Sequence, residues 1–234
     1  MRLAGRIVGL LLIAAGVLTL AWVVVVWQWQ DPFTAIYTHI EQGHLSSEYK
    51  REAAAVTAKV HPVRHAPNTA RLRRDLLREA KTYETTLKTG HVVGRITIGR
   101  IGLKMMVVQG TDEESLKKGP GHYATSGVPG AGSLIYIAGH RTTYLAPFSA
   151  INSIRIGDYV TLEVPYGTFT YRVTRHYVVP ATDLALLVDH GHEILRLQAC
   201  HPRFFATHRY IVDAVPVSVT LPGGKTYPLG AKTA

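Results

Sequence analysis

The chain contains one residue with strongly nucleophilic chemistry, the thiol of Cys200. It is the only cysteine among 234 residues, which excludes a disulfide within the chain and a metal site built from several cysteines. Cys200 ends an apolar run over residues 194–200. In a strand, Arg196, Gln198 and Cys200 share one face, so the thiol lies on a polar face. This placement suits a reactive thiol, and a buried inert cysteine is the alternative.

Arg209 follows Cys200 after a segment, 201–208, that contains Pro202. If the runs on either side pair as antiparallel strands, Cys200 and Arg209 lie opposite one another and point to the same face. An arginine beside a cysteine favours the thiolate, or stabilises a carbonyl oxygen as it gains negative charge. The alternative is a surface arginine in a minor salt bridge.

His140 is the candidate proton carrier. It leaves an apolar run, 133–138, directly after Gly139, and we expect its ring at the mouth of a barrel. A nucleophilic cysteine needs a group that moves protons, and histidine has the appropriate pKa. His201 and His208 are competing bases, but in an extended chain each points away from its neighbour, Cys200 or Arg209.

Short β-like runs separated by Gly and Pro must position these side chains. They predict an all-β domain, a mostly antiparallel barrel or sandwich, with one short helix over 112–118 capped by Thr111. The predicted strands are 92–98, 103–108, 133–138, 159–164, 169–177, 194–200 and 210–219.

Residues 7–27 form an uncharged apolar run, long enough to span a bilayer as a helix. Arg2 and Arg6 precede it, so the positive-inside bias predicts a cytoplasmic N-terminus and an extracellular remainder. The prediction is a single-pass protein of the cell membrane, and a cleaved signal peptide is the alternative.

Residues 31–90 predict two helices separated by Pro62 and Pro67. The first is Ala-rich, over 48–59. The second follows a cap at Asn68 and carries an apolar stripe: Leu72, Leu76, Ala80, Tyr83 and Leu87. We expect a stalk that lifts the domain off the membrane, or a second helix that lies on the bilayer.

The net charge is +10, with no dense basic block. This argues against nucleic acid as a partner and favours an anionic membrane or cell-wall surface.

Four motifs in order then resemble the sortase transpeptidases, most closely the class E type of high-GC Gram-positive bacteria. The resemblance covers 92–219 and implies an eight-stranded β-barrel with short helices. The implied organisation is an anchor over 1–30, a helical stalk over 31–90, a catalytic barrel over 91–222 and a tail over 223–234. The motifs are Ile98-Gly-Arg-Ile-Gly-Leu103, Gly119-Pro-Gly-His-Tyr123, Ala138-Gly-His-Arg-Thr-Thr-Tyr144 and Cys200-His-Pro-Arg203 with Arg209.

The resemblance assigns Cys200 as nucleophile, His140 as general acid/base and Arg209 as the group that positions substrate or stabilises the oxyanion. The implied reaction cleaves an LPXTG-like sorting signal (often LAXTG in class E) between Thr and Gly through a thioacyl intermediate. An amine of peptidoglycan then accepts the protein. The implied partners are surface proteins with this signal, that amine and the lipid bilayer. We predict no cofactor and no metal.

Substrate-binding candidates are Tyr144, Arg141, Ala199 and His122. Ala199 stands where the family usually has Thr, and Arg196 adds a cation near the same face. Leu145 stands where class E commonly has Gly. For His122 the alternative is a structural role that orders the Gly-Pro-Gly-His-Tyr turn.

Two other functions remain open from the sequence. One is a hydrolytic cysteine peptidase, in which water resolves the thioester. The other is a catalytically idle barrel that binds envelope peptides, for which Ala199 and Arg196 would be signs of lost activity.

Overall fold

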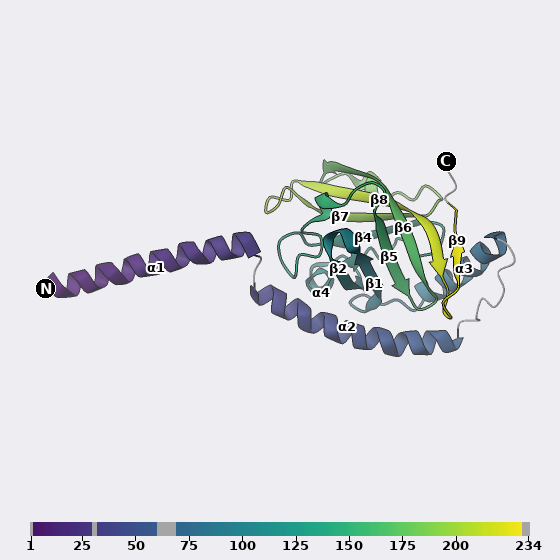
Figure 1. The fold of residues 1–234 in the computed structure, drawn as a ribbon, viewed down its shortest axis with the longest axis horizontal. Coiled ribbons are helices and arrows are strands. Elements are labelled where there is room, and N and C mark those ends of the chain that lie inside the picture. The colour runs from purple at the N-terminus through teal and green to yellow at the C-terminus, as the bar shows by residue number, and fades with distance from the viewer. Residues whose placement is uncertain (1, 30–31, 60–68, 231–234) are drawn as a thin grey trace.

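The computed structural model describes residues 2–29, 32–59 and 69–230 and consists of helices that lead into a β-barrel (Figure 1). The helices are α1 (Arg2–Trp29), α2 (Pro32–Lys59), α3 (Thr69–Glu84) and α4 (Glu113–Lys118). The strands are β1 (Val92–Ile98), β2 (Leu103–Gln109), β3 (Gly121–His122), β4 (Leu134–Gly139), β5 (Tyr159–Val164), β6 (Gly167–Pro180), β7 (Ile194–His201), β8 (His208–Thr220) and β9 (Thr226–Pro228).

The sheet closes on itself. Its strand order is β6-β5-β1-β2-β3-β4-β7-β8-β9, and β6 also pairs with β8. Within the described residues this closes a ring of eight strands, with β9 attached outside the ring. Among the described strands, only the pairs β2–β3 and β4–β7 run parallel. The predicted eight-stranded, mostly antiparallel barrel is confirmed, and the sandwich alternative is wrong.

Alternation along β7 separates the core from the polar face. Leu195, Leu197 and Ala199 are fully buried in the main hydrophobic cluster. Because successive strand side chains point to opposite faces, Arg196, Gln198 and Cys200 lie on the other side of the sheet. The core therefore sets the register that places the thiol on the polar face.

Helix α1 is a candidate membrane span. Residues Gly5–Val24 are long and apolar enough to cross a bilayer, and none of this segment is buried against the rest of the protein.

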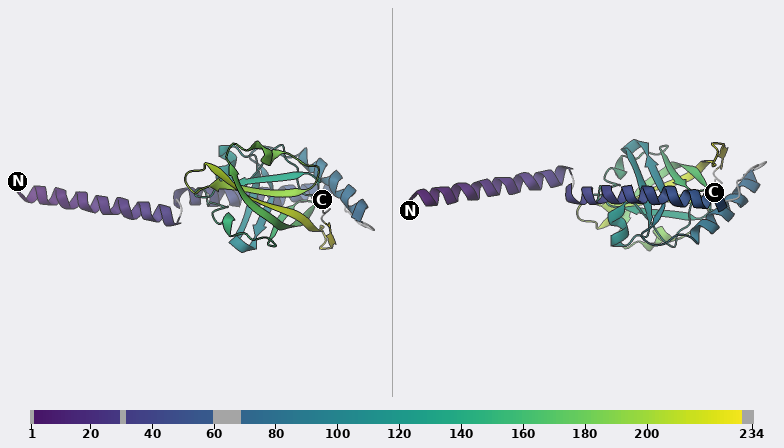
Figure 2. Two further views of the ribbon diagram at one scale, coloured as in Figure 1. Left: turned by 90° about the horizontal axis from the view of Figure 1, so that it is seen from above. Right: turned by 90° about the horizontal axis from the view of Figure 1, so that it is seen from below.

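Helix α2 packs along the barrel (Figures 1 and 2). Its Leu45 and Tyr49 share a hydrophobic cluster with Val92, Met106 and Val108. Gln42 also pairs with β2, accepting from the Met106 N–H at 2.6 Å and donating to the Met106 carbonyl at 3.0 Å. The predicted Ala-rich helix therefore begins much earlier, at Pro32, and is part of the domain rather than a stalk.

Helix α3 is also part of the domain core. Its predicted apolar stripe, Leu72, Leu76, Ala80 and Tyr83, is buried in the main cluster. The Tyr83 hydroxyl donates to the Val93 carbonyl at 2.7 Å. The stripe thus covers the barrel, and neither a stalk nor a helix lying on the bilayer describes it.

Two smaller predictions need correction. Helix α4 is capped by Asp112, whose carboxylate accepts from the Ser115 N–H, and not by Thr111. The predicted tail contains β9, which pairs with β8. The predicted Pro62, Pro67 and Asn68 signals lie outside the described residues.

Candidate active site

The pair of Cys200 and Arg209 is built by the β7–β8 hairpin. The two residues are register partners, as the sequence predicted. Cys200 is half-buried and its thiol is free. The Arg209 Nη1 donates to the Ala206 carbonyl at 2.8 Å and to the His208 carbonyl at 3.1 Å. The guanidinium is thus held by its own loop, beside the strand position of the thiol.

His140 reaches the same level from β4. This strand pairs in parallel with β7, and Gly139 is opposite Ala199. His140 therefore leaves β4 where β7 presents Cys200. A Cβ on residue 139 would lie 2.5 Å from the Phe148 ring, which is fully buried. Only glycine fits at this exit, which explains the glycine before the histidine.

The surroundings of His140 suit a proton carrier. Burial lowers the pKa of its imidazole, and the charge of Glu113 opposes this shift. The Nε2 atom is buried and has no hydrogen-bond partner among the described residues. The Tyr144 ring lies 5.3 Å from the His140 ring between centroids. Burial therefore favours the neutral form of the imidazole.

Tyr144 belongs to a loop that α2 holds in place. The Tyr144 N–H donates to the Thr34 Oγ1 at 3.1 Å, and the Tyr37 ring meets the Tyr144 ring edge-on at 6.4 Å. Tyr144, Leu145 and Ala146 all have left-handed backbone, with φ of 52°, 58° and 37°. A left-handed backbone favours glycine at position 145. Leu145 adopts this backbone conformation at a cost in steric strain.

Arg141 joins the loop that carries His140 to the backbone of the nucleophile. Its Nη1 donates to the Cys200 carbonyl at 3.2 Å and lies 2.9 Å from the His201 Nδ1. Its Nη2 donates to the Asn152 Oδ1 at 2.9 Å. The side chain is buried, so these contacts support a bracing role in place of the predicted contact with substrate.

The other two substrate-binding candidates are buried. The Ala199 side chain is fully buried in the core. His122 is buried as well: its Nε2 lies 2.8 Å from the Gly127 carbonyl and its Nδ1 lies 2.7 Å from the Gln109 side-chain oxygen. Burial lowers the pKa of His122. These contacts are those of the structural alternative, in which His122 orders the turn.

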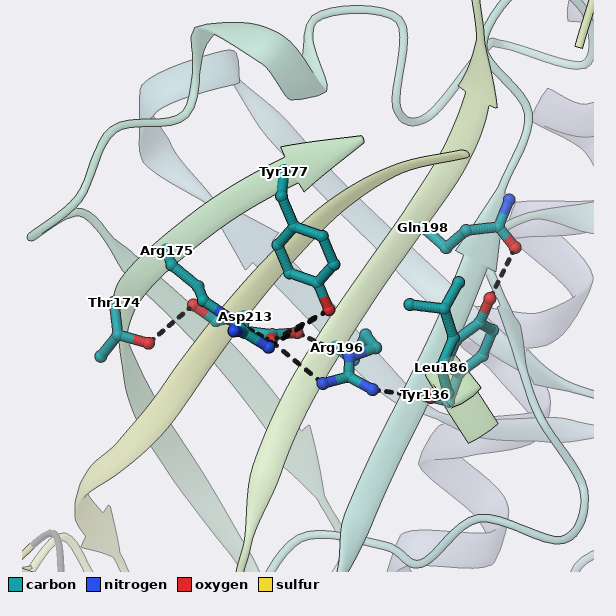
Figure 3. Close-up of polar contacts among 8 residues, drawn as sticks. All are labelled: Tyr136, Thr174, Arg175, Tyr177, Leu186, Arg196, Gln198 and Asp213. Carbon is teal, nitrogen blue, oxygen red and sulfur yellow. Dashed lines mark hydrogen bonds and ion pairs between the residues drawn. The ribbon is translucent and has the colours of Figure 1, made fainter. Parts of the chain in front are cut away.

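The cation of Arg196 is neutralised inside the protein (Figure 3). Its Nε and Nη2 donate to the two Asp213 carboxylate oxygens at 2.7 and 3.0 Å, and its Nη1 donates to the Leu186 carbonyl at 2.7 Å. Arg196 and Asp213 are register partners on β7 and β8. Arg196 is therefore a structural ion pair and not a loose charge near the thiol.

Sequence reasoning missed Tyr136 and Asp213 on this face, where it had already placed Gln198. The Tyr136 hydroxyl donates to the Gln198 Oε1 at 2.8 Å (Figure 3). Burial raises the pKa of Tyr136 to about 12, and the Arg209 charge opposes the shift. A lone acid in the apolar run 210–219 was the available signal for Asp213, since a buried carboxylate needs a cation.

One cluster outside this site has metal-binding side chains. Glu48 and Glu52 of α2 and His91 before β1 place ligand atoms within 4.8 Å of one another. The His91 Nδ1 lies 2.5 Å from the Glu48 Oε1. This contact already joins α2 to the barrel without an ion.

Comparisons with known proteins show the family of this chain. The sortase domain model matches residues 96–217. Sortase D of Bacillus subtilis is 33% identical over 129 residues, which cover 53% of this chain and 64% of that protein. The matched region spans less than two thirds of the curated relatives' length.

Solved structures of sortases are also similar to this chain. Sortase E of Streptomyces avermitilis is 31% identical, with a TM-score of 0.50, and the match covers 63% of this chain and 97% of that one. Sortase C1 of Streptococcus agalactiae is 30% identical, with a TM-score of 0.52, over 60% of this chain and 76% of that one. Relatives of several classes match, so class E is not singled out. The sortase domain model matches more than half of the chain, and the chain belongs to the sortase family.

Proposed function

We propose that this sortase is a membrane-anchored cysteine transpeptidase that resembles class E. In this proposal α1 crosses the cell membrane with its N-terminus in the cytoplasm, and the barrel faces the outside. The substrate is a surface protein with an LAXTG- or LPXTG-like signal, and the acceptor is a peptidoglycan amine. The observation that carries the proposal is the register pair of Cys200 and Arg209 at the level where His140 leaves β4.

The first half of the reaction makes a thioester. The Cys200 thiol gives its proton to the His140 imidazole, and Sγ bonds to the threonine carbonyl carbon of the Thr–Gly peptide bond. Arg209 stabilises the oxygen as it gains negative charge. When the C–N bond breaks, His140 returns the proton to the departing glycine amine. Burial favours neutral imidazole, which helps this proton leave.

The second half transfers the acyl group. The acceptor amine attacks the thioester carbonyl, the C–S bond breaks, and an amide bond forms. His140 accepts the proton that the amine loses and gives it to the departing Cys200 sulfur, which becomes a thiol again. The catalytic residues end in their starting states, so the cycle balances.

Incubation with a short LAXTG peptide and a diamine tests this function. We expect a ligated product, identified by mass spectrometry, together with the released glycine fragment. An LPXTG peptide and an unrelated peptide serve as comparisons for signal preference. Hydrolysed peptide without any ligated product would favour the peptidase alternative and contradict the transpeptidase.

Arg209→Ala is expected to slow acylation about 10²- to 10³-fold, the usual cost of losing an oxyanion donor. KM for the peptide should change less than about threefold, since the interaction acts in the transition state. Single-turnover rates and steady-state KM measure both quantities.

Arg172→Ala is the matched control for Arg209→Ala, because Arg172 is exposed on β6. It should retain nearly full activity. Arg209→Lys should be intermediate, since it keeps the charge but loses the planar geometry. Full turnover in Arg209→Ala would remove Arg209 from the mechanism.

A further inference from the structure

The β7–β8 loop exposes two adjacent aromatic side chains next to the candidate active site. Phe204 is 57% exposed and Phe205 is 77% exposed. Phe204 and Ala206 have left-handed backbone, with φ of 71° and 53°. The Arg203 guanidinium donates to the Ser149 carbonyl, and Arg209 donates to the Ala206 carbonyl. The loop therefore presents the two rings on a backbone braced at both ends.

Helix α2 exposes apolar side chains at the same end of the protein. Ile36 and Ile40 lie four residues apart, so they share one face of the helix, and both are more than half exposed. The neighbouring Tyr37 packs on Tyr144 in the loop after His140. Exposed apolar side chains of two elements thus lie at the end of the protein that holds the candidate active site. Exposed apolar clusters of this kind mark contact with a partner or a membrane.

The short connection between α1 and α2 indicates what the exposed apolar side chains contact. Helix α1 ends at Trp29, and Thr34 accepts a hydrogen bond from the Tyr144 N–H. Five residues reach at most about 18 Å. If α1 spans the bilayer, the loop after His140 therefore lies close to the point where the chain leaves the membrane. Figures 1 and 2 show the β7–β8 loop at this same end of the barrel.

The chemistry of the surface fits a bilayer interface. Aromatic and aliphatic side chains gain free energy when they leave water for the boundary between headgroups and acyl chains. Exposed Glu113 and Glu114 of α4 lie near the same end. Both carboxylates pair with Lys117, at 3.0 and 2.6 Å, so the proposed contact is argued from the exposed apolar side chains and not from charge.

We propose that Phe204 and Phe205 insert into the outer interface of the bilayer that holds α1, with Ile36 and Ile40 facing the same surface. The inference rests on the membrane anchoring in the proposed function. It places the Cys200–Arg209 pair at the membrane surface, where a substrate still held by its own membrane segment would present its signal.

A single tryptophan in the loop tests the insertion. The chain has three tryptophans, Trp22, Trp27 and Trp29. In the full chain with all three changed to Phe, Phe205→Trp gives the only indole, reconstituted in phosphatidylcholine–phosphatidylglycerol vesicles. Quenching by lipids brominated on the acyl chains should be at least about threefold stronger than for Lys225→Trp, because only a ring in the bilayer meets the bromines.

Lys225→Trp is the matched control, because it lies in the β8–β9 turn, at the other end of β8 from Arg209. Equal quenching at 205 and 225 would overturn the proposal. The parent chain, with its native tryptophans, reports the anchor separately. If its fluorescence is not quenched, α1 does not insert, and the anchoring on which the inference rests is overturned as well.

A comparison of two substrates tests whether the two rings contact the membrane or bind the sorting peptide. The Phe204→Ser/Phe205→Ser variant should lose about tenfold in rate on a substrate embedded in the same vesicles, through lost interfacial binding. Its rate on a soluble peptide should stay within about twofold of the parent. Equal losses on both substrates would assign the rings to peptide binding and contradict the membrane contact. Ile156→Ser, another exposed apolar position, should leave both rates unchanged.

Discussion

Cys200→Ala is expected to reduce acyl transfer at least about a thousandfold, because the covalent route disappears with the nucleophile. Cys200 is the only thiol, so no other side chain can form the thioester. Mass spectrometry of the intact protein, with peptide but without amine, should show one acyl adduct on the parent and none on the variant. More than about a tenth of the parent activity in Cys200→Ala would contradict a thioacyl mechanism.

The fold of Cys200→Ala provides the control. Cys200 is half-buried on the polar face and is not part of the core clusters, so its loss should cost no more than about 1 kcal/mol of unfolding free energy. Inactivity then reports chemistry and not unfolding. A peptidyl vinyl sulfone should add once to the parent, at Cys200. Failure of this labelling, beside a labelled active sortase, would favour the idle peptide-binding barrel.

Local patterns predicted most of the barrel and the Cys200–Arg209 pair. The two residues lie on consecutive strands of one hairpin, and hairpin register follows from the strand ends and the connecting loop. The glycine before His140 was visible in the sequence. Its reason, the buried Phe148 ring, required the fold.

Contacts between distant segments were not predictable in this way. The apolar stripe of α3 was read correctly, but a stripe does not say whether it covers a bilayer or a barrel; the structure buries it in the core. The β6–β8 pairing that closes the ring joins segments about 40 residues apart along the chain. Arg196 is a different case, because its partner Asp213 lies in the same hairpin register that pairs Cys200 with Arg209. The pairing was therefore available from the sequence and was not used.

Asp213→Ala is expected to destabilise the protein by about 3–5 kcal/mol, the usual cost of leaving a buried charge without its partner. The side chains of Arg196 and Asp213 are only 5% and 4% exposed. Asp213 also pairs with Arg175 at 3.0 Å (Figure 3). Urea denaturation of the detergent-solubilised chain should show a lower midpoint with an unchanged slope.

Two further variants test whether the lost unfolding free energy comes from the buried arginine that Asp213→Ala leaves without a partner. Glu163→Ala removes the carboxylate that faces Arg95 at 3.2 Å, where the side chains are 39% and 24% exposed, and should cost less than about 1 kcal/mol. Arg196→Met/Asp213→Leu removes both buried charges. It should recover most of the loss, because apolar replacements of a buried ion pair are often neutral or stabilising. A double variant no more stable than Asp213→Ala would mean that the pair stabilises the barrel through its geometry, including the Arg196 bond to the Leu186 carbonyl that holds the β6–β7 connection.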